Sequence, residues 1–173
     1  MEKYIPDIYQ KNIYSINYDN LISRGIKYLL FDLDNTIAPI TEKRPSESTI
    51  NLFRFLKNKN FKIMIISNSL EGRVSTFAKE LKVDYISNAK KPSNKKLLKV
   101  VKDNSFDIDK TAIIGDSMLD DVVVGNSIGI TTVLTDQLDK HEFPFARLKR
   151  FKERRIQIKL RDNNLFTKGR YYE

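Results

Sequence analysis

The sequence predicts an α/β fold in which a central, mostly parallel sheet is covered by helices on both faces, a three-layer Rossmann-like architecture. Short apolar runs that suit strands alternate along the chain with segments of helical periodicity, and this alternation is typical of parallel sheets. The 173 residues are enough for one domain with a substantial core. We expect this domain to comprise a helical N-terminal segment, a core and a basic helical C-terminal segment, at residues 1–26, 27–135 and 141–161.

Five strands are expected, each a short apolar run bounded by polar residues or turn formers. The first, second and fourth lead directly into polar residues, which places those residues at the carboxyl ends of buried strands. The expected strands cover residues 27–32, 61–67, 83–86, 111–115 and 130–134.

Helices are expected between these strands. The clearest covers residues 74–81, where apolar side chains recur at i, i+3, i+4 and i+7. Ser46 opens the preceding helix, and Ser93 is expected to be the N-cap of the following one. Gly129 suits the position just after the last helix before the fifth strand. The apolar faces comprise Ile50, Phe53 and Leu56, then Val74, Phe77, Ala78 and Leu81, then Leu97, Val100 and Val101, then Leu119, Val122 and Val123.

The composition excludes several kinds of site. The chain has no cysteine, so neither a disulfide framework nor a thiolate metal site can form. His141 is the only histidine, which excludes a zinc site built from several histidines of one chain. The N-terminus lacks the apolar stretch of a signal peptide, and apolar runs such as 63–66 are far too short to cross a membrane. We therefore expect a soluble, cytoplasmic protein.

The positive charge is concentrated near the C-terminus. The formal net charge is +9, but segment 147–161 alone holds eight lysines or arginines against one acid, Glu153, a net of +7. If this segment is helical, the apolar residues among its arginines suit peripheral contact with an anionic membrane, which we favour, or with RNA phosphates. A solvated helix face that packs its aromatic residues on the domain is the simpler alternative.

The run Asp32-Leu33-Asp34-Asn35-Thr36 follows the first expected strand and is the most informative feature of the chain. Because side chains alternate along a strand, Asp32 and Asp34 are expected to point the same way. Close carboxylates shift each other's pKa unless a cation or a proton lies between them. The pair therefore suggests a metal site, an acid/base pair, or both.

More polar residues are expected at the same edge of the sheet. Ligands of open parallel sheets bind beyond the carboxyl ends of the strands, which is where Ser67-Asn68 and Gly115-Asp116 lie. Lys91 can join them from a loop. Carboxylates, a hydroxyl, a lysine and backbone amides together suit Mg²⁺ and a phosphoryl group.

Taken in order, these motifs resemble those of the haloacid dehalogenase-like (HAD) phosphatases. The closer resemblance is to the YqeG-like, IIIA-type subfamily, which is related to phosphatidylglycerophosphate phosphatases, and it extends over nearly the whole chain. It implies an Mg²⁺-dependent phosphatase with the HAD fold. The motifs are Asp32-Leu33-Asp34-Asn35-Thr36, Ser67-Asn68, Lys91-Pro92 and Gly115-Asp116-Ser117-Met118-Leu119-Asp120-Asp121.

The resemblance implies a role for each aspartate. Asp32 would be the nucleophile that forms an aspartyl-phosphate, and Asp34 would be the general acid and base. Mg²⁺ would be held by Asp32, the backbone carbonyl of Asp34, and Asp116. Asp121 would orient the motif lysine or a metal-bound water, a role that suits neighbouring Asp120 less well.

The resemblance also implies how the phosphoryl group is bound. Ser67 and the backbone amide of Asn68 would bind its oxygens, and Lys91, rather than Lys90, would offset charge on nucleophile and phosphate. The stretch after Ser67 departs slightly from the pattern, since Leu70 stands where relatives are more polar. This difference concerns substrate contacts more than chemistry.

The spacing of the motifs predicts an open site without a large cap domain. Only a dozen or so residues separate Asp34 from the helix opened by Ser46, and the gap between Ser67 and Lys91 is filled by one helix and one strand. An uncovered site suits large substrates such as a lipid head group, a protein or a nucleic-acid end, as well as small phosphomonoesters.

Each functional interpretation has a structural alternative. Asn35 and Thr36 can form the turn after the strand instead of contacting substrate. Ser67 can be a cap, and Lys91 an ordinary solvated lysine. His141 is expected at the surface. For the whole chain, the alternative to a phosphatase is a binding module of the same fold at a membrane or ribosome, and a phosphotransferase is a further variant.

Overall fold

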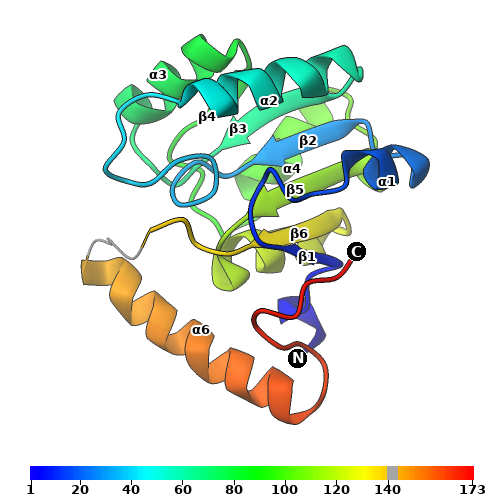
Figure 1. Ribbon diagram of the computed structural model, residues 1–173, viewed down its shortest axis with the longest axis vertical. Helices are drawn as coiled ribbons and strands as arrows, with labels where there is room; N and C mark the ends of the chain where they lie inside the picture. Colours follow the sequence, from blue (N-terminus) through cyan, green and yellow to red (C-terminus); the bar gives the residue numbers. More distant parts are fainter. Residues whose placement is uncertain (140–143) are drawn as a thin grey trace.

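The computed structural model describes residues 1–139 and 144–173, with side chains described at 1–139 and 148–173. Six strands form one parallel sheet in the order β1-β6-β5-β2-β3-β4 (Figure 1). The predicted α/β fold is confirmed. The strands are β1 Ile8–Gln10, β2 Tyr28–Phe31, β3 Lys62–Ile66, β4 Asp84–Ile86, β5 Thr111–Gly115 and β6 Thr131–Thr135. The α-helices are α1 Tyr18–Ser23, α2 Glu47–Asn58, α3 Glu71–Leu81, α4 Lys95–Asp103, α5 Val123–Ile128 and α6 Pro144–Asp162.

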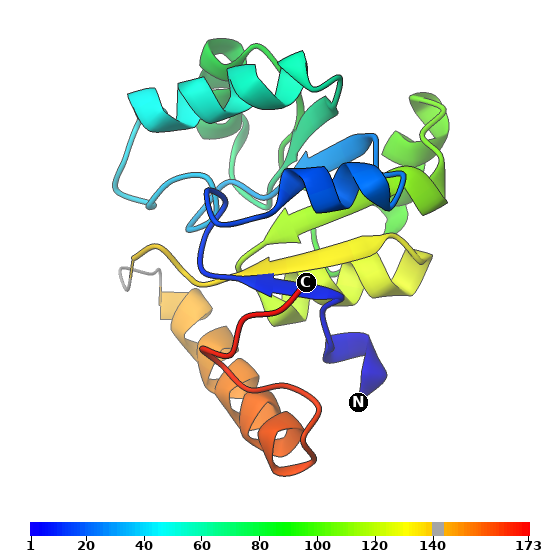
Figure 2. The same ribbon diagram turned by 45° about the vertical axis from the view of Figure 1, so that its right-hand side comes forward.

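Both faces of the sheet are covered by helices (Figure 2). Side chains alternate along β2, so Leu29 and Phe31 belong to the core beneath α1, α2 and α3. Leu30 lies on the opposite face, in the core beneath α4 and α5. β2 lies between β5 and β3, and all three are parallel, so their carboxyl ends meet at one edge.

The N-terminal segment 1–26 differs from the expectation that it is helical. It contains a short 3₁₀-helix η1, Glu2–Tyr4, and α1, but β1 lies between them and pairs with β6. Asp7 supports this pairing, since its carboxylate accepts a hydrogen bond of 2.7 Å from the backbone N–H of Thr132. A three-residue strand is too short to show the alternation by which strands are predicted.

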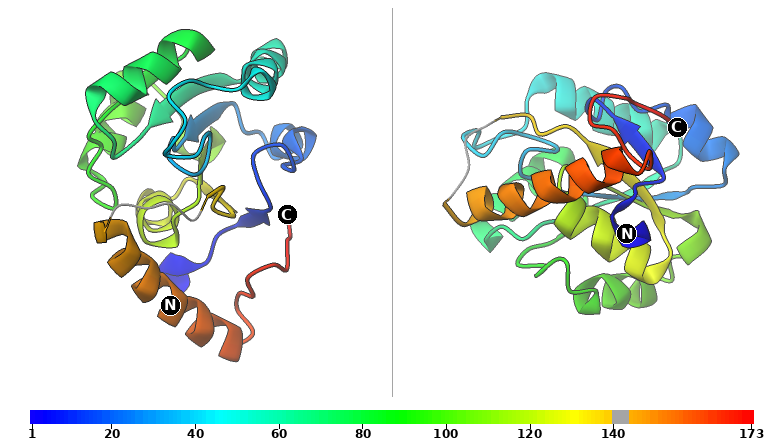
Figure 3. Two further views of the ribbon diagram at one scale, coloured as in Figure 1. Left: turned by 60° about the vertical axis from the view of Figure 1, so that its left-hand side comes forward. Right: turned by 90° about the horizontal axis from the view of Figure 1, so that it is seen from below.

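The C-terminal residues form a third, smaller cluster at the β1 edge. Tyr9 and Leu134 of the sheet pack there with Leu160 of α6 and with Phe166. Tyr9 and Tyr172 exchange two backbone hydrogen bonds of 2.9 Å, so the chain end returns to β1 (Figure 3). The expected basic helix is present as α6, whereas residues 141–143, including His141, lie outside the described residues. Among the described helices, none has the length and apolar character needed to cross a membrane.

Helix boundaries follow local signals in two cases and depart from them in two. Ser46 is the N-cap of α2, and Gly129 ends α5 with a φ of 81°. The predicted cap at Ser93 is wrong, because its N–H bonds to Lys90 in a turn and α4 begins after Asn94. The last helix before β6 begins with a π-helical turn, η3, Met118–Val122, before it becomes α5.

Gly125 is required where α5 crosses the sheet. A Cβ atom there would lie 2.4 Å from Thr132 and 2.7 Å from Ile113, and both contacts are sterically prohibited. We expect Gly125→Ala to lower the free energy of unfolding by about 1–3 kcal/mol, measured by urea denaturation. The matched control is Gly72→Ala in α3, where no atom lies within 4 Å and the change should be neutral or mildly stabilising. Equal effects of the two substitutions would contradict this packing.

Candidate functional site

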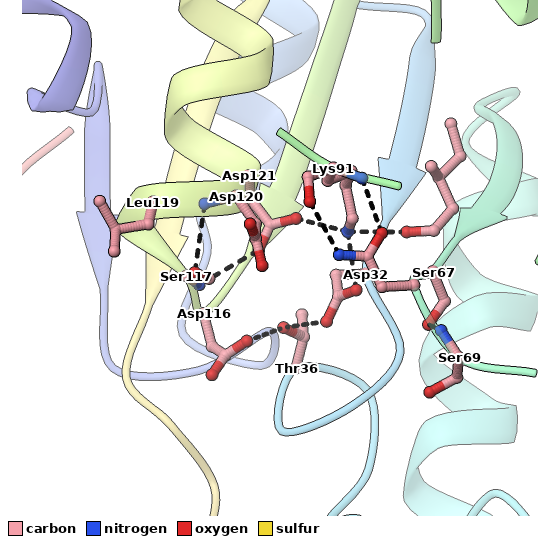
Figure 4. Close-up of polar contacts among 12 residues, drawn as sticks. Asp32, Thr36, Ser67, Ser69, Lys91, Asp116, Ser117, Leu119, Asp120 and Asp121 are labelled. Carbon is pink, nitrogen blue, oxygen red and sulfur yellow. Dashed lines mark hydrogen bonds and ion pairs between the residues drawn. The ribbon is translucent and has the colours of Figure 1, made fainter. Parts of the chain in front are cut away.

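The polar ends of β2, β3 and β5 meet at one edge of the sheet and line a cavity of about 600 Å³. Figure 4 shows the side chains that converge there. The structure therefore brings together the residues that the motifs singled out. The predicted residues that line the cavity are Asp32, Asp34, Asn35, Ser67, Asn68, Lys91, Asp116 and Asp121.

Lys91 lies at the centre of this cluster. Its ammonium is 2.7 Å from Asp32, 2.5 Å from Asp121 and 2.9 Å from the carbonyl oxygen of Ile66. Three acceptors satisfy the three donors of an ammonium group. Because Lys91 is only 5% exposed, the alternative of a solvated lysine is wrong, whereas Lys90 is exposed.

Lys91 remains charged despite its burial. Burial alone would lower the pKa of Lys91, but the carboxylates of Asp121 and Asp32 outweigh it and raise that pKa above its ordinary value. The loop that carries Lys91 is fixed by the amide side chain of Asn68, whose oxygen accepts from the Lys91 N–H at 2.7 Å and whose nitrogen donates to the Lys91 carbonyl at 3.0 Å.

Three buried carboxylates form a cluster that could hold a cation. Asp32, Asp116 and Asp121 each offer an oxygen within 4.8 Å of the others. The Thr36 hydroxyl lies between two of them, 3.3 Å from Oδ2 of Asp32 and 3.4 Å from Oδ1 of Asp116. Asp121 differs from the other two, because one of its oxygens pairs with Lys91 and the other accepts from a backbone N–H at 3.1 Å.

Crowding and burial make Asp32 and Asp116 hard to ionise together. Burial raises the pKa of Asp32 well above its ordinary value, although Lys91 opposes the rise. Burial likewise raises the pKa of Asp116 to about 7, against the opposing charge of Arg150. Both shifts oppose ionisation, which a cation bound beside the two carboxylates would favour.

The charges that line the cavity do not balance. Six carboxylates face four cationic side chains, a formal excess of two negative charges. One divalent cation would remove this excess, so the residues present fit such an ion in charge as well as in ligand type. The carboxylates are Asp32, Asp34, Asp116, Asp120, Asp121 and Glu153, and the cations are Arg73, Lys91, Lys149 and Arg150.

Asp34 lines the cavity near the start of α3. Its carboxylate accepts a hydrogen bond from the Ser69 hydroxyl and pairs with Nε of Arg73 at 2.7 Å. Arg73 also donates to the carbonyl of Pro39 at 3.0 Å, which ties α3 to the loop after Asp34. The motifs do not include Arg73, because a single arginine in a helix has no distinguishing sequence signal.

Asn35 and Thr36, the two residues after Asp34, form the tight turn that was the alternative to a role in substrate contact. Asn35 has a φ of 63°, and its N–H bonds to the carbonyl of Ala38 at 2.8 Å. Its side-chain oxygen is buried and has no hydrogen-bond partner in the described part of the chain. Ser67 also has a local role, since its hydroxyl accepts from the N–H of Ser69 at 3.1 Å.

Helix α6 contributes residues to the site that the motifs did not predict. Glu153 is 3% exposed, and its carboxylate accepts hydrogen bonds of 3.0 Å from the Ser117 hydroxyl and from the N–H of Leu119. The sequence does contain one signal for it, because Glu153 is the only acid within the basic segment 147–161. A lone acid in such a segment indicates a specific partner.

Two cations of α6 bind the loop after β5 and the turn η3 that follows it. Arg150 pairs with the carboxylate of Asp116, donates to the Asp116 carbonyl at 3.1 Å and contacts Glu153 at 2.7 Å. Lys149 binds both oxygens of Asp120, at 2.7 and 2.5 Å. Asp120 therefore contacts α6, and Asp121, not Asp120, contacts the motif lysine.

Comparison with known proteins assigns the chain to a family. Residues 1–139 match the family model described as mitochondrial PGP phosphatase. The chain belongs to this family. It is 32% identical over 153 residues to the "Probable phosphatase YqeG" of Bacillus subtilis (strain 168), which covers 88% of this chain and 89% of that protein. The predicted resemblance to these phosphatases is thus confirmed, and the protein is a phosphatase.

Solved structures support the same fold. A predicted HAD-like family hydrolase from Porphyromonas gingivalis superimposes with a TM-score of 0.52 at 12% identity, covering 73% of this chain and 98% of that one. The cobalt-bound deoxy-D-mannose-octulosonate 8-phosphate phosphatase of Haemophilus influenzae gives a TM-score of 0.50 at 13% identity, covering 66% and 80%.

The raised pKa of Asp116 predicts how the metal-free protein responds to pH. Between the ordinary carboxyl pKa of 3.8 and the folded value of about 7, the folded protein binds more protons than the unfolded chain. Asp116 therefore makes its full contribution to the free energy of unfolding below pH 4, and this contribution is lost as the pH rises to 7.

We expect Asp116→Asn to remove this loss. In EDTA at pH 8, its free energy of unfolding should exceed that of the wild type by on the order of 1–3 kcal/mol, and the difference should vanish near pH 4. Urea denaturation at the two pH values measures both. Asp84→Asn on the exposed part of β4 is the matched control and should show no such gain. A destabilised Asp116→Asn at pH 8 would contradict the prediction.

Proposed function

We propose that the protein hydrolyses a phosphomonoester with the help of Mg²⁺, through an aspartyl-phosphate formed on Asp32. The observation that carries this proposal is the position of Asp32, whose carboxylate lies between a charged buried lysine and the carboxylate of Asp116 at the open edge of the sheet. An anionic nucleophile held beside a fixed cation can approach a phosphate without the full cost of charge repulsion.

The chain's own residues account for each proton and bond. A carboxylate oxygen of Asp32 attacks phosphorus as the bond to the leaving oxygen breaks, and Asp34, which enters this step protonated, gives that oxygen its proton. Asp34 then takes a proton from water, which attacks phosphorus and releases Asp32. The contacts of Asp34 with Ser69 and Arg73 hold its carboxylate at the cavity wall, and this position suits the step in which it takes a proton from water. Ser67 and the backbone amide of Asn68 bind the phosphoryl oxygens, and Lys91, whose three donors are already engaged, offsets the charge of nucleophile and phosphate.

The fit of a divalent cation is best at Asp32 and Asp116. Their oxygens Oδ2 and Oδ1 converge on the Thr36 hydroxyl, and the backbone carbonyl of Asp34 is proposed as a third ligand. Both oxygens of Asp121 are engaged elsewhere, which supports its proposed role in orienting Lys91. When bound, Mg²⁺ would offset the charge of the phosphoryl group and of the crowded carboxylates.

The proposed substrate is phosphatidylglycerophosphate or another large phosphomonoester. The name of the matched family suggests this lipid, and no inserted domain stands between Asp34 and α2 to cover the site. A lipid substrate would bring a cytoplasmic protein into peripheral contact with a membrane. A small soluble phosphomonoester is the alternative substrate, and a non-catalytic module at a membrane or RNA is the alternative function.

Substitution of the two motif aspartates tests the mechanism. We expect Asp32→Asn to abolish Mg²⁺-dependent phosphate release from an aryl phosphate, and Asp34→Asn to lower kcat by about 10²–10⁴-fold. EDTA should stop the wild-type reaction, and Asp84→Asn should leave it unchanged. Full activity of Asp32→Asn, or activity in EDTA, would refute the mechanism. Phosphate release from phosphatidylglycerophosphate, nucleotides, sugar phosphates and phosphopeptides then ranks the substrates.

Arg150 is expected to orient Asp116 for the cation. Its guanidinium binds one carboxylate oxygen of Asp116 while the other faces Thr36, so the proposed ligand is held by a neighbouring side chain. We expect Arg150→Ala to weaken Mg²⁺ binding by about 10–100-fold, measured by calorimetric titration and by the Mg²⁺-dependent rise in Tm. Lys152→Ala, an exposed residue of the same helix, is the matched control. Unchanged Mg²⁺ binding in Arg150→Ala would remove this role.

A further inference from the structure

Helix α6 lies along one side of the domain (Figure 3), and its two sides differ chemically. On the inner side Glu153, Ile156 and Leu160 face the domain. On the opposite side Leu148, Phe151 and Ile158 are 61%, 60% and 44% exposed. Spacings of three and seven residues place these apolar side chains along one stripe of a helix.

Cations border this stripe. The guanidinium of Arg155 lies over the ring of Phe151 at 6.0 Å from its centroid. An acid on the same side, Asp162, is paired with Arg161 at 2.9 Å. We call the stripe and its cations the outer face of α6. The outer face comprises Leu148, Lys152, Phe151, Arg154, Arg155, Ile158 and Lys159, all of them exposed.

We propose that the outer face of α6 docks the protein on an anionic lipid surface. Helices that lie in a membrane interface combine a central apolar stripe with lysines and arginines at its borders, whose long stems let the charge reach the lipid phosphates. Charge complementarity selects the anionic surface. RNA would match the cations as well, but it offers no apolar phase in which Leu148 and Ile158 could be buried.

The same helix links the docking surface to the catalytic cavity. Lys149 and Arg150 line that cavity, and they are direct neighbours in the chain of Leu148 and Phe151 on the outer face. Docking therefore places the lipid surface against the helix whose inner side lines the cavity. This last step rests on the proposed phosphatase acting on a lipid phosphate, whereas membrane binding itself does not.

Vesicle co-sedimentation of the full chain tests the proposal. We expect binding to vesicles of phosphatidylglycerol and phosphatidylcholine at least about tenfold tighter than to phosphatidylcholine alone. The double variant Leu148→Ser/Phe151→Ser should lose binding by about tenfold or more. The matched control is Leu98→Ser/Phe55→Ser, at side chains 42% and 48% exposed on α4 and α2, and it should bind like the wild type.

Three results would overturn the proposal: no binding to anionic vesicles, equal binding to neutral ones, or binding that Leu148→Ser/Phe151→Ser leaves intact. Tighter binding to an RNA hairpin than to the vesicles would identify the face as a nucleic-acid surface instead. Thermal unfolding checks that each variant is folded. Hydrolysis of a soluble aryl phosphate, measured in parallel, should be the same in wild type and Leu148→Ser/Phe151→Ser. A failure of the proposed function is thereby separated from a failure of docking.

Discussion

The buried ammonium of Lys91 holds the active edge of the sheet together. It joins Asp32 at the end of β2, the last carbonyl of β3 and Asp121 after β5, so three neighbouring strands share one cation. Removing one partner from such a buried group is far more costly than losing a surface ion pair, because the remaining charge is left in a low dielectric. The same contacts that fix this edge also set the charge beside the proposed nucleophile, so structure and chemistry depend on one interaction.

This arrangement leaves negative charge in excess, and the excess is informative. A fold selected only for stability would balance a buried cluster, yet burial raises the pKa of both Asp32 and Asp116. The imbalance is useful only if a ligand of opposite charge completes the site. Lys91 and Arg150 are each already bound to more than one acceptor, so neither side chain can neutralise the remaining negative charge.

The sequence predicts the parts of this protein that depend on local patterns. The five predicted strands, β2 to β6, and the residues at their ends follow from apolar runs that lead into short polar motifs. The sequence does not predict β1, because three residues are too few to show a periodicity. Ser93 is not the N-cap of α4, because it lies in a turn with Lys90 and the helix begins after Asn94. The contacts of Arg150 with Asp116 join residues 34 positions apart, and only the packing of α6 brings them together. Pairs so far apart in the sequence have no characteristic spacing by which they could be predicted. Glu153 is distinguished in the sequence only by its negative charge within a basic segment.

Helix α6 explains how a domain with no inserted domain between Asp34 and α2 can still close one side of its cavity. An inserted cap would cover the cavity from above, whereas α6 closes one side through Lys149, Arg150 and Glu153. Because successive residues of a helix point about 100° apart, inward and outward residues must alternate within a few positions. Any element that tilts or lifts α6 therefore acts on Asp116 directly through Arg150. The residues that line the site and those of the outer face belong to one helix. A surface that binds the outer face of α6 therefore also affects the position of Arg150 and, through it, of Asp116.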